Sequence, residues 1–119
     1  MVGQREILTR GGIYLAKLSS AKAAEVEKVR PIVILNAQEI LDILPPVIFI
    51  CPLSSQSYPA FNSLHVKLSP RDNLKAISYA LVEHCRAISI NRMTYPRIAQ
   101  LTHAELLIIL HRLQQLVDG

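Results

Sequence analysis

The chain has 119 residues, 50% of them apolar and 18% charged, which predicts one folded domain over residues 1–119 and excludes a disordered chain. No apolar run can span a bilayer, and the polar first ten residues lack the apolar segment of a signal peptide, so we expect a cytoplasmic protein without membrane contact. The formal net charge of +4 gives a mild preference for polyanions such as RNA or DNA, but the 5% of aromatic residues give little support to a broad base-stacking surface.

The first third of the chain predicts two strands joined by a polar connection. Arg10-Gly11-Gly12 has the composition of a turn, and the apolar residues 13–18 after it indicate a strand. Residues 19–29 are rich in Ser, Ala, Lys and Glu, and a connection of this length in a small domain is usually functional. Residues 31–35 follow Arg30 as an unbroken, mostly β-branched run, typical of a strand buried on both faces.

A short helix and a third apolar strand come next. We expect Asn36 to cap the helix, with Glu39 at the reciprocal capping position, and Pro45-Pro46 to end it. Residues 47–53 are apolar throughout and predict a strand that runs directly into the polar loop 54–59.

The second half of the chain predicts shorter strands. Residues 64–68 alternate between apolar and polar, which places His65 and Lys67 on a solvent-exposed face. Residues 78–83 indicate a further strand with a short continuation over 85–88. Residues 91–97 are expected to form a connector that leads to a last short strand at 97–100.

The C-terminal segment predicts an α-helix that carries more apolar surface than one stripe requires. Thr102 and Glu105 form a capping box at its start. Five consecutive apolar residues, 106–110, follow it, and Leu116 and Val117 extend the pattern. These additional apolar residues indicate either that the helix contacts a second partner or that it is deeply buried. Because the strands follow one another without long helical crossovers, we predict a mainly β (α+β) chain with a small antiparallel barrel.

The common catalytic and metal-binding motifs are absent from the sequence. It has no glycine-rich phosphate loop, no Gly-x-Ser-x-Gly elbow and no His-Glu-x-x-His motif, so we expect no metal and no cofactor. The spacing of Cys51 and Cys85 fits no zinc or redox motif, and we expect both to be small buried side chains. A paired-histidine acid–base site would require His65 to fold against His84, which we do not expect for a solvent-facing His65.

One constellation of residues could cleave a phosphodiester without a metal. Arg30 stands at the start of one apolar strand and Ser54 at the end of the next. Adjacent antiparallel strands bring these positions together at one rim of the sheet, with Glu25 on the loop above them. Arg30 would neutralise charge that develops on phosphorus, Ser54 would orient the phosphate, and Glu25 would assist proton transfer or position the substrate.

Several segments, in this order, carry a resemblance to a known family. They are Gly-Gly-Ile-Tyr-Leu-Ala-x-Leu at 11–18, the loop with Glu25, Val-Arg-Pro-Ile-Val-Ile-Leu at 29–35, Val-Ile-Phe-Ile-Cys-Pro-Leu-Ser-Ser-Gln at 47–56, and Glu-His-Cys-Arg-Ala-Ile at 83–88 followed by Arg92. Together they resemble the MazF/PemK family of toxins over roughly residues 10–117.

The resemblance implies a fold, an activity and a set of residues. It implies a small SH3-like antiparallel barrel with a short inserted helix and a C-terminal helix, assembled as a homodimer. The activity is that of a sequence-specific, metal-independent endoribonuclease, which cuts single-stranded RNA to a 2′,3′-cyclic phosphate and a 5′-hydroxyl and is blocked by a cognate acidic antitoxin. The family's catalytic positions fall on Arg30, Ser54 and Glu25. We expect substrate contacts from the residues near them, Lys28, Ser55, Gln56, Tyr58 and Arg86.

The chain also departs from the family pattern. Residues 19–25 lack the family's usual proline and glycine, and Ser54 replaces the commoner threonine, which keeps the hydroxyl but loses the stiffening methyl group. These departures leave open a catalytically silent barrel that binds RNA or an antitoxin. A gyrase poison like CcdB is a further alternative, although the chain lacks the Trp-Gly-Ile ending of those proteins.

Overall fold

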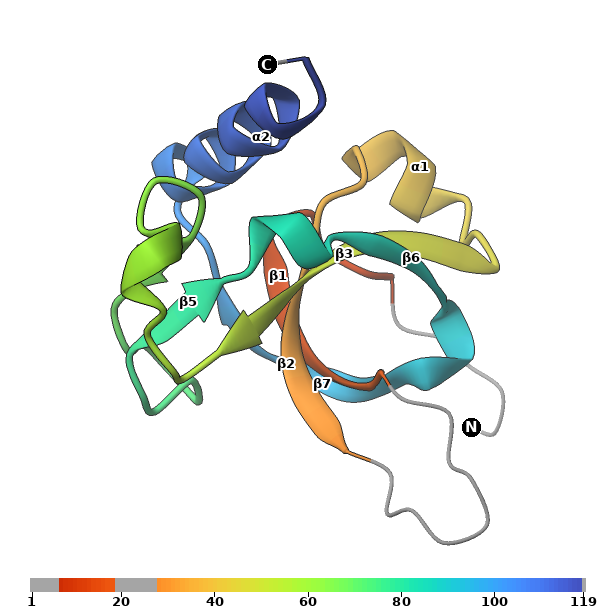
Figure 1. Ribbon diagram of the computed structural model, residues 1–119. Coiled ribbons are helices and arrows are strands. Elements are labelled where there is room, and N and C mark those ends of the chain that lie inside the picture. Colours follow the sequence, from red (N-terminus) through yellow and green to blue (C-terminus); the bar gives the residue numbers. More distant parts are fainter. Residues whose placement is uncertain (1–6, 19–27, 119) are drawn as a thin grey trace, which may run out of the picture.

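The computed structural model describes residues 7–18 and 28–118. Two α-helices and seven strands form its framework (Figure 1). The elements are β1 (Gly12–Lys17), β2 (Val29–Ile34), α1 (Gln38–Asp42), β3 (Val47–Ser54), β4 (Val66–Leu68), β5 (Ser78–Ala80), β6 (Arg86–Ser89), β7 (Met93–Gln100) and α2 (His103–Asp118). Three 3₁₀ turns connect them: η1 (Pro59–Phe61), η2 (Val82–His84) and η3 (Ile90–Arg92).

The strands form one antiparallel sheet that curves into a half-barrel. Its order is β4-β5-β3-β2-β1-β7, and β6 pairs with the first half of β3 while β5 pairs with the second half. Figure 1 shows β1, β2, β3, β6 and β7 curving around a shared interior. The predicted fold class, a small antiparallel barrel with an inserted helix and a C-terminal helix, is confirmed.

The unbroken apolar run at the centre of the sheet is buried on both faces, as predicted. Ile32, Val33 and Ile34 of β2 have no solvent-exposed surface. They lie between β1 and β3, and their side chains alternate between two apolar clusters on the two faces of the sheet. Pro31 pairs only with Leu15 of β1, at a position where β2 extends beyond its pairing with β3, so its missing N–H interrupts no pairing with β3.

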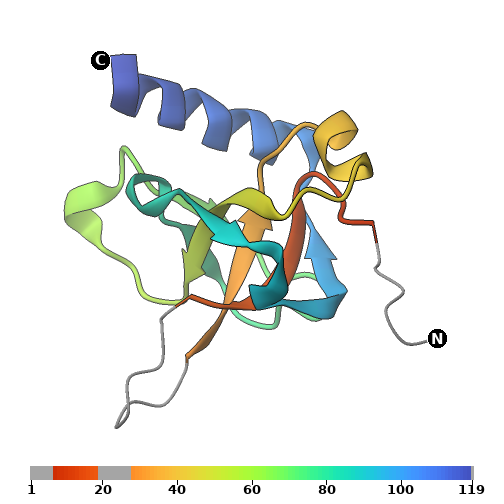
Figure 2. The ribbon, with the colours of Figure 1, turned by 90° about the vertical axis from the view of Figure 1, so that its right-hand side faces the viewer.

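Helix α2 lies across one end of the strands (Figure 2). The capping box is present: the Glu105 N–H donates to Thr102 Oγ1 at 3.1 Å, and the Thr102 N–H donates to Glu105 Oε1 at 2.8 Å. Leu106 and Ile109 pack into the core that the helix shares with β4 and β5. Leu107, Ile108, Leu116 and Val117 remain exposed, so this chain alone does not bury the surplus apolar surface.

Two local predictions about α1 are wrong. Asn36 does not cap the helix, because its Oδ1 accepts the Phe49 N–H of β3 at 2.8 Å and so ties the chain to the neighbouring strand. The residue that precedes the helix is Ala37, which makes no side-chain cap, and Glu39 therefore has no reciprocal partner there. Only Leu41 of this short helix is buried.

The prediction that His65 faces solvent is also wrong. Strand β4 begins one residue later, at Val66, and the His65 side chain is only 4% exposed. Phe61 stacks on its ring, and Arg112 of α2 donates a hydrogen bond to its carbonyl oxygen. Lys67 is exposed, as expected.

The remaining boundaries differ in detail. Strand β5 ends at Ala80 because residues 82–84 turn into η2, and β7 includes most of the expected connector, from Met93 onward. Both cysteines are free, Cys51 buried and Cys85 half-buried against the same core cluster. No helix within the described ranges is long and apolar enough to cross a membrane.

Candidate active site

The rim of the sheet where β2 begins and β3 ends carries an open groove of about 710 Å³. Its polar lining residues are Arg30, Ser54, Ser55, Gln56, Asn73, Lys75 and Ser78. Apolar side chains of β1, β3 and β7 form much of the remaining surface, including Leu15, Leu53 and Ile98. Four of the sequence-predicted site residues therefore line the same groove.

The strand register explains why Arg30 and Ser54 come together. Ile32 of β2 stands opposite Pro52 of β3 in the antiparallel ladder. Arg30 lies two residues before Ile32, and Ser54 lies two residues after Pro52. Because the strands are antiparallel, both steps lead to the same end of the sheet. Because side chains alternate along a strand, Arg30 and Ser54 share the side of the sheet on which Ile32 and Pro52 lie. The juxtaposition follows from the antiparallel register, which brings the start of β2 beside the end of β3.

Both residues have polar groups that are free to bind a ligand. Arg30 is exposed and makes no hydrogen bond or ion pair with another described residue. The Ser54 hydroxyl oxygen accepts the Gln56 N–H at 3.1 Å, which leaves its own hydrogen to be donated. A guanidinium fork and a hydroxyl donor at one rim are suited to the oxygens of a phosphate group.

The opposite wall of the groove was not predicted. Asn73 and Lys75 belong to the turn between β4 and β5, and Ser78 opens β5. The Asn73 N–H donates to the Ile98 carbonyl of β7 at 3.0 Å, which folds this turn across the groove. No local pattern in the sequence shows which strands this turn faces.

Three of the expected substrate-binding residues lie outside this groove. Arg86 opens β6 opposite Ile50, well before the end of β3, and its guanidinium donates to the Leu18 carbonyl. Lys28 is exposed next to β2 but is not part of the lining. Tyr58 lines a separate cavity on the loop that follows Gln56. Their contact with substrate stays a prediction, and Glu25 lies outside the described residues.

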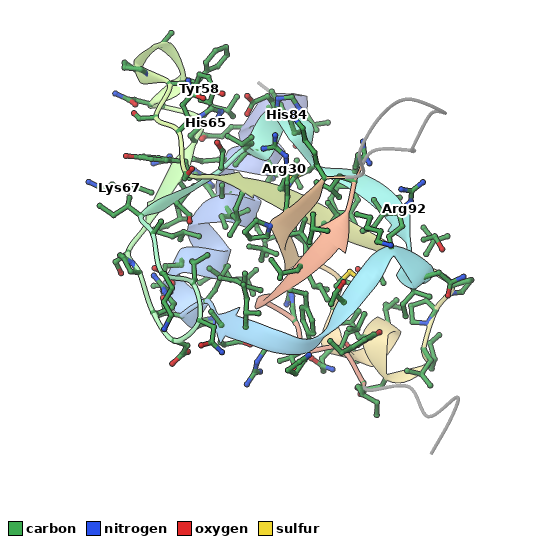
Figure 3. All side chains as sticks on the ribbon, turned by 90° about the horizontal axis from the view of Figure 1, so that it is seen from below. Arg30, Tyr58, His65, Lys67, His84 and Arg92 are labelled. Carbon is green, nitrogen blue, oxygen red and sulfur yellow. The ribbon has the colours of Figure 1, made fainter. Side chains whose placement is uncertain are left out.

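The structure brings together a second polar cluster, which the sequence analysis did not expect. His65 Nε2 lies 2.8 Å from both carboxylate oxygens of Glu83, and His84 Nε2 lies 3.7 Å from one of them. Figure 3 shows His65 and His84 close to Tyr58 at one corner of the molecule. Burial of Glu83, the largest single influence, favours its neutral form, but the hydrogen bond from His65, a backbone hydrogen bond and the nearby histidines together outweigh burial and lower the pKa of Glu83.

The described residues also include no group of three or more His, Cys, Asp or Glu side chains arranged to hold a metal ion. The groove itself presents Arg30, Ser54 and Lys75 among its polar lining residues. These groups supply positive charge and hydrogen-bond donors, which are the features of a site for a phosphate-containing ligand.

The curved antiparallel sheet, the helix across one end and the arginine–serine rim define a small barrel protein with a phosphate-compatible groove. The model of the family described as "PemK-like, MazF-like toxin of type II toxin-antitoxin system" matches residues 9–117. The chain therefore belongs to this family of toxins from type II toxin–antitoxin systems. A search of curated proteins finds no match.

Solved structures support the same fold at low sequence identity. A MazE–MazF structure from Deinococcus radiodurans is 17% identical, with a TM-score of 0.77 over 95% of this chain and 97% of that chain. The Mycobacterium tuberculosis toxin MazF-mt6 is 16% identical, with a TM-score of 0.72 over 90% of this chain and 96% of that chain. A mycobacterial endoribonuclease in complex with its cognate antitoxin is 14% identical, with a TM-score of 0.69 and 95% coverage of each chain.

Proposed function

We propose that this protein is a sequence-specific endoribonuclease that cleaves single-stranded RNA without a metal ion. The observation that carries the proposal is the shared groove of Arg30 and Ser54, in a chain that belongs to a toxin family. Two structures with this fold are described as endoribonucleases. A groove with unpaired donors suits the phosphate backbone that every RNA presents.

The groove residues support cleavage by the 2′-hydroxyl of the RNA itself. The O2′–P bond forms as the P–O5′ bond breaks, which leaves a 2′,3′-cyclic phosphate and, after protonation of the leaving oxygen, a 5′-hydroxyl. Arg30 stabilises the charge that accumulates on the phosphoryl oxygens, and the Ser54 hydroxyl fixes one of those oxygens. We assign Glu25 to assist transfer of the 2′-hydroxyl proton.

Substrate binding is assigned to the polar residues around this pair. Ser55 and Gln56 continue the chain from Ser54 along the groove, and Lys75 adds positive charge on the opposite wall. The net charge of +4 favours the approach of RNA, and it also favours an acidic antitoxin. Lys28 and Arg86 would contact the strand beyond the groove.

Two partners complete the proposal: a second copy of the chain and a cognate antitoxin. The exposed apolar residues Leu107, Ile108, Leu116 and Val117 of α2 supply surface for such contacts. Structures with this fold are described as MazE–MazF and as a complex with a cognate antitoxin. We expect light scattering to give twice the mass of the 13.3 kDa chain.

The test is cleavage of a long single-stranded RNA in the presence of a chelator. The native protein should yield discrete fragments with cyclic phosphate ends, Arg30→Ala should cut about 10²–10³-fold more slowly, and Arg97→Ala should behave like the native protein. Arg97 is a matched control because it is exposed and its neighbour Ile98, not Arg97, lines the groove. Intact RNA that remains bound to the native protein would contradict the nuclease and favour the catalytically silent barrel.

A further inference from the structure

A second cavity, of about 240 Å³, includes Tyr58 of the loop that follows Gln56 and has the make-up of a site for a planar ring. Its lining residues are Tyr58, Phe61, His65, Leu81, Glu83 and His84. Small-molecule sites typically measure about 300–1,000 Å³, so this volume suits one ring system rather than a chain of nucleotides. The residues Tyr58 and Phe61 are 40% and 45% exposed, so both offer aromatic surface for stacking.

The aromatic part of this cavity is held in place by the fold. Phe61 stacks on the His65 ring with the planes 18° apart and the centroids 5.4 Å apart, and Tyr58 meets the same ring edge-on at 6.0 Å. The Phe61 N–H donates to the Tyr58 carbonyl, and the His65 N–H donates to the Phe61 carbonyl. Arg112 anchors the loop to α2 through the His65 carbonyl. A preformed platform of this kind loses little conformational entropy on binding.

The polar part of the cavity offers hydrogen-bond acceptors. A carboxylate only accepts, so His65 Nε2 must donate to Glu83, and each oxygen of Glu83 keeps a further lone pair. His65 Nδ1 is buried and has no hydrogen-bond partner among the described residues. His65 also lines a neighbouring cavity of about 510 Å³. A ligand that fits must present N–H donors.

The cavity is close to the proposed cleavage site along the chain. Only three residues separate Ser54 from Tyr58, so their α-carbons lie at most about 14 Å apart. The Tyr58 hydroxyl donates to Gln56 Oε1 at 3.2 Å, and Gln56 lines the groove. A single strand held at Arg30 and Ser54 can therefore extend a neighbouring base into the cavity.

We propose that the cavity formed by Tyr58, Phe61, His65 and Glu83 binds one guanine base of the RNA and sets the cleavage sequence. Among the four bases, guanine alone presents two adjacent N–H donors, at N1 and N2, to a carboxylate. Adenine and cytosine carry a ring nitrogen acceptor beside their single amino group. This ring nitrogen would face a carboxylate oxygen, which is also an acceptor, so the two atoms would repel each other. Sequence-specific recognition of single-stranded RNA commonly combines aromatic stacking with contacts to this edge of the base. The inference rests on the proposed function for its link to cleavage.

The first test measures binding, which does not depend on catalysis. Short uridine oligonucleotides with one central guanine, adenine or cytosine, fully 2′-O-methylated so that they cannot be cut, are titrated into the full-length protein. The guanine oligonucleotide should bind about 10- to 100-fold more tightly than the others, the range expected for a bidentate contact. Equal affinities would overturn the inference. Inosine, which lacks the N2 amino group, should fall between guanine and adenine.

Matched variants assign that preference to the cavity. Tyr58→Ala should weaken binding of the guanine oligonucleotide about tenfold, and Tyr58→Phe should bind like the native protein because the ring remains. Glu83→Gln should remove the guanine preference, and Glu39→Gln, an exposed carboxylate on α1, should not. Because Tyr58 is exposed, its truncation should leave the fold intact. Tyr58→Ala therefore tests the site even if the Glu83→Gln protein unfolds.

Cleavage mapping separates this inference from the proposed function. Sequencing of the 5′-hydroxyl ends should place guanine at one fixed position near the cut. Cleavage with no guanine preference would overturn the guanine site and leave the nuclease intact. Guanine-specific binding without cleavage would overturn the nuclease and leave the guanine site intact.

Discussion

Two arginines in different regions of this small barrel show opposite uses of the same side chain. Arg71, at the junction of the β4–β5 turn with α2, donates to both carboxylate oxygens of Glu105 and to the backbone oxygen and hydroxyl of Ser69. It also donates to the carbonyl oxygen of Gln100. Its side chain is only 17% exposed. Arg30, at the groove rim, is exposed and makes no bond to a described residue. An arginine with every donor paired supports the fold, whereas one left unpaired at a groove is available to a ligand.

The largest expected effect sharpens this comparison at the groove. Arg30→Ala should reduce RNA cleavage by about 10²–10³-fold, because it removes a charged donor from the developing phosphorane. Its thermal unfolding midpoint should equal that of the native protein. Arg30→Lys should recover part of the loss, since it restores the charge but not the planar fork. If Arg30→Ala unfolds at a lower temperature but its folded fraction cleaves RNA at the native rate, Arg30 supports the fold and not the reaction.

The second effect concerns the partner of Arg30 at the rim. Ser54→Ala should reduce the cleavage rate by about 10- to 100-fold, which corresponds to a hydrogen bond to a charged group. Ser54→Thr should retain activity because it keeps the hydroxyl. Ser63→Ala, in the exposed turn before β4, serves as the matched control. The measurement is the initial rate on an RNA with a mapped site, and equal rates for Ser54→Ala and the native protein would remove Ser54 from the mechanism.

The third effect tests the paired arginine. Arg71→Ala should destabilise the fold by about 1–3 kcal/mol, because it leaves the half-buried Glu105 without its charged partner. Urea unfolding measures this change, with Arg97→Ala as an exposed control. Cleavage measured well below the unfolding midpoint should change only a few-fold. A large loss of activity with native stability would place Arg71 in the site and break the comparison.

The smallest effect is the pH dependence of the same pair. The hydrogen bonds from Arg71 outweigh burial and lower the pKa of Glu105 below its ordinary value of 4.5. Because the pKa of Glu105 is lower in the folded protein than in the unfolded chain, the unfolded chain takes up a proton first as the pH falls. The stabilisation of the fold by the Arg71–Glu105 pair is therefore fully present above pH 4.5, and it is lost as the pH falls through the pKa of Glu105 in the folded protein.

Glu105→Gln isolates this contribution, since glutamine can still complete the capping box. The free energy of unfolding between pH 6 and pH 3 should fall more steeply for the native protein than for Glu105→Gln. Glu39→Gln should follow the native curve. Parallel curves for the native protein and Glu105→Gln would show that the pair adds nothing to the pH dependence.

The sequence by itself determined those features of the protein that depend on residues close to one another in the chain. The run Ile32, Val33 and Ile34 predicts a strand buried on both faces, because no polar side chain interrupts it. Thr102 and Glu105 predict the start of α2, because a capping box closes within one turn. Consecutive antiparallel strands also place Arg30 and Ser54 at one rim, because the start of one strand lies beside the end of the next.

Only the tertiary structure decided what covers each of those elements. Alternation around His65 indicates a face of a strand, but the Phe61 loop and Arg112 of α2 determine that this position is buried. Asn36 has the identity of a helix cap, yet the neighbouring β3 offers its side chain the Phe49 N–H. Asn73 joins the groove from a distant turn. Such contacts depend on how separate segments pack, and hydrogen-bond partners far apart in the chain leave no periodic trace in the sequence.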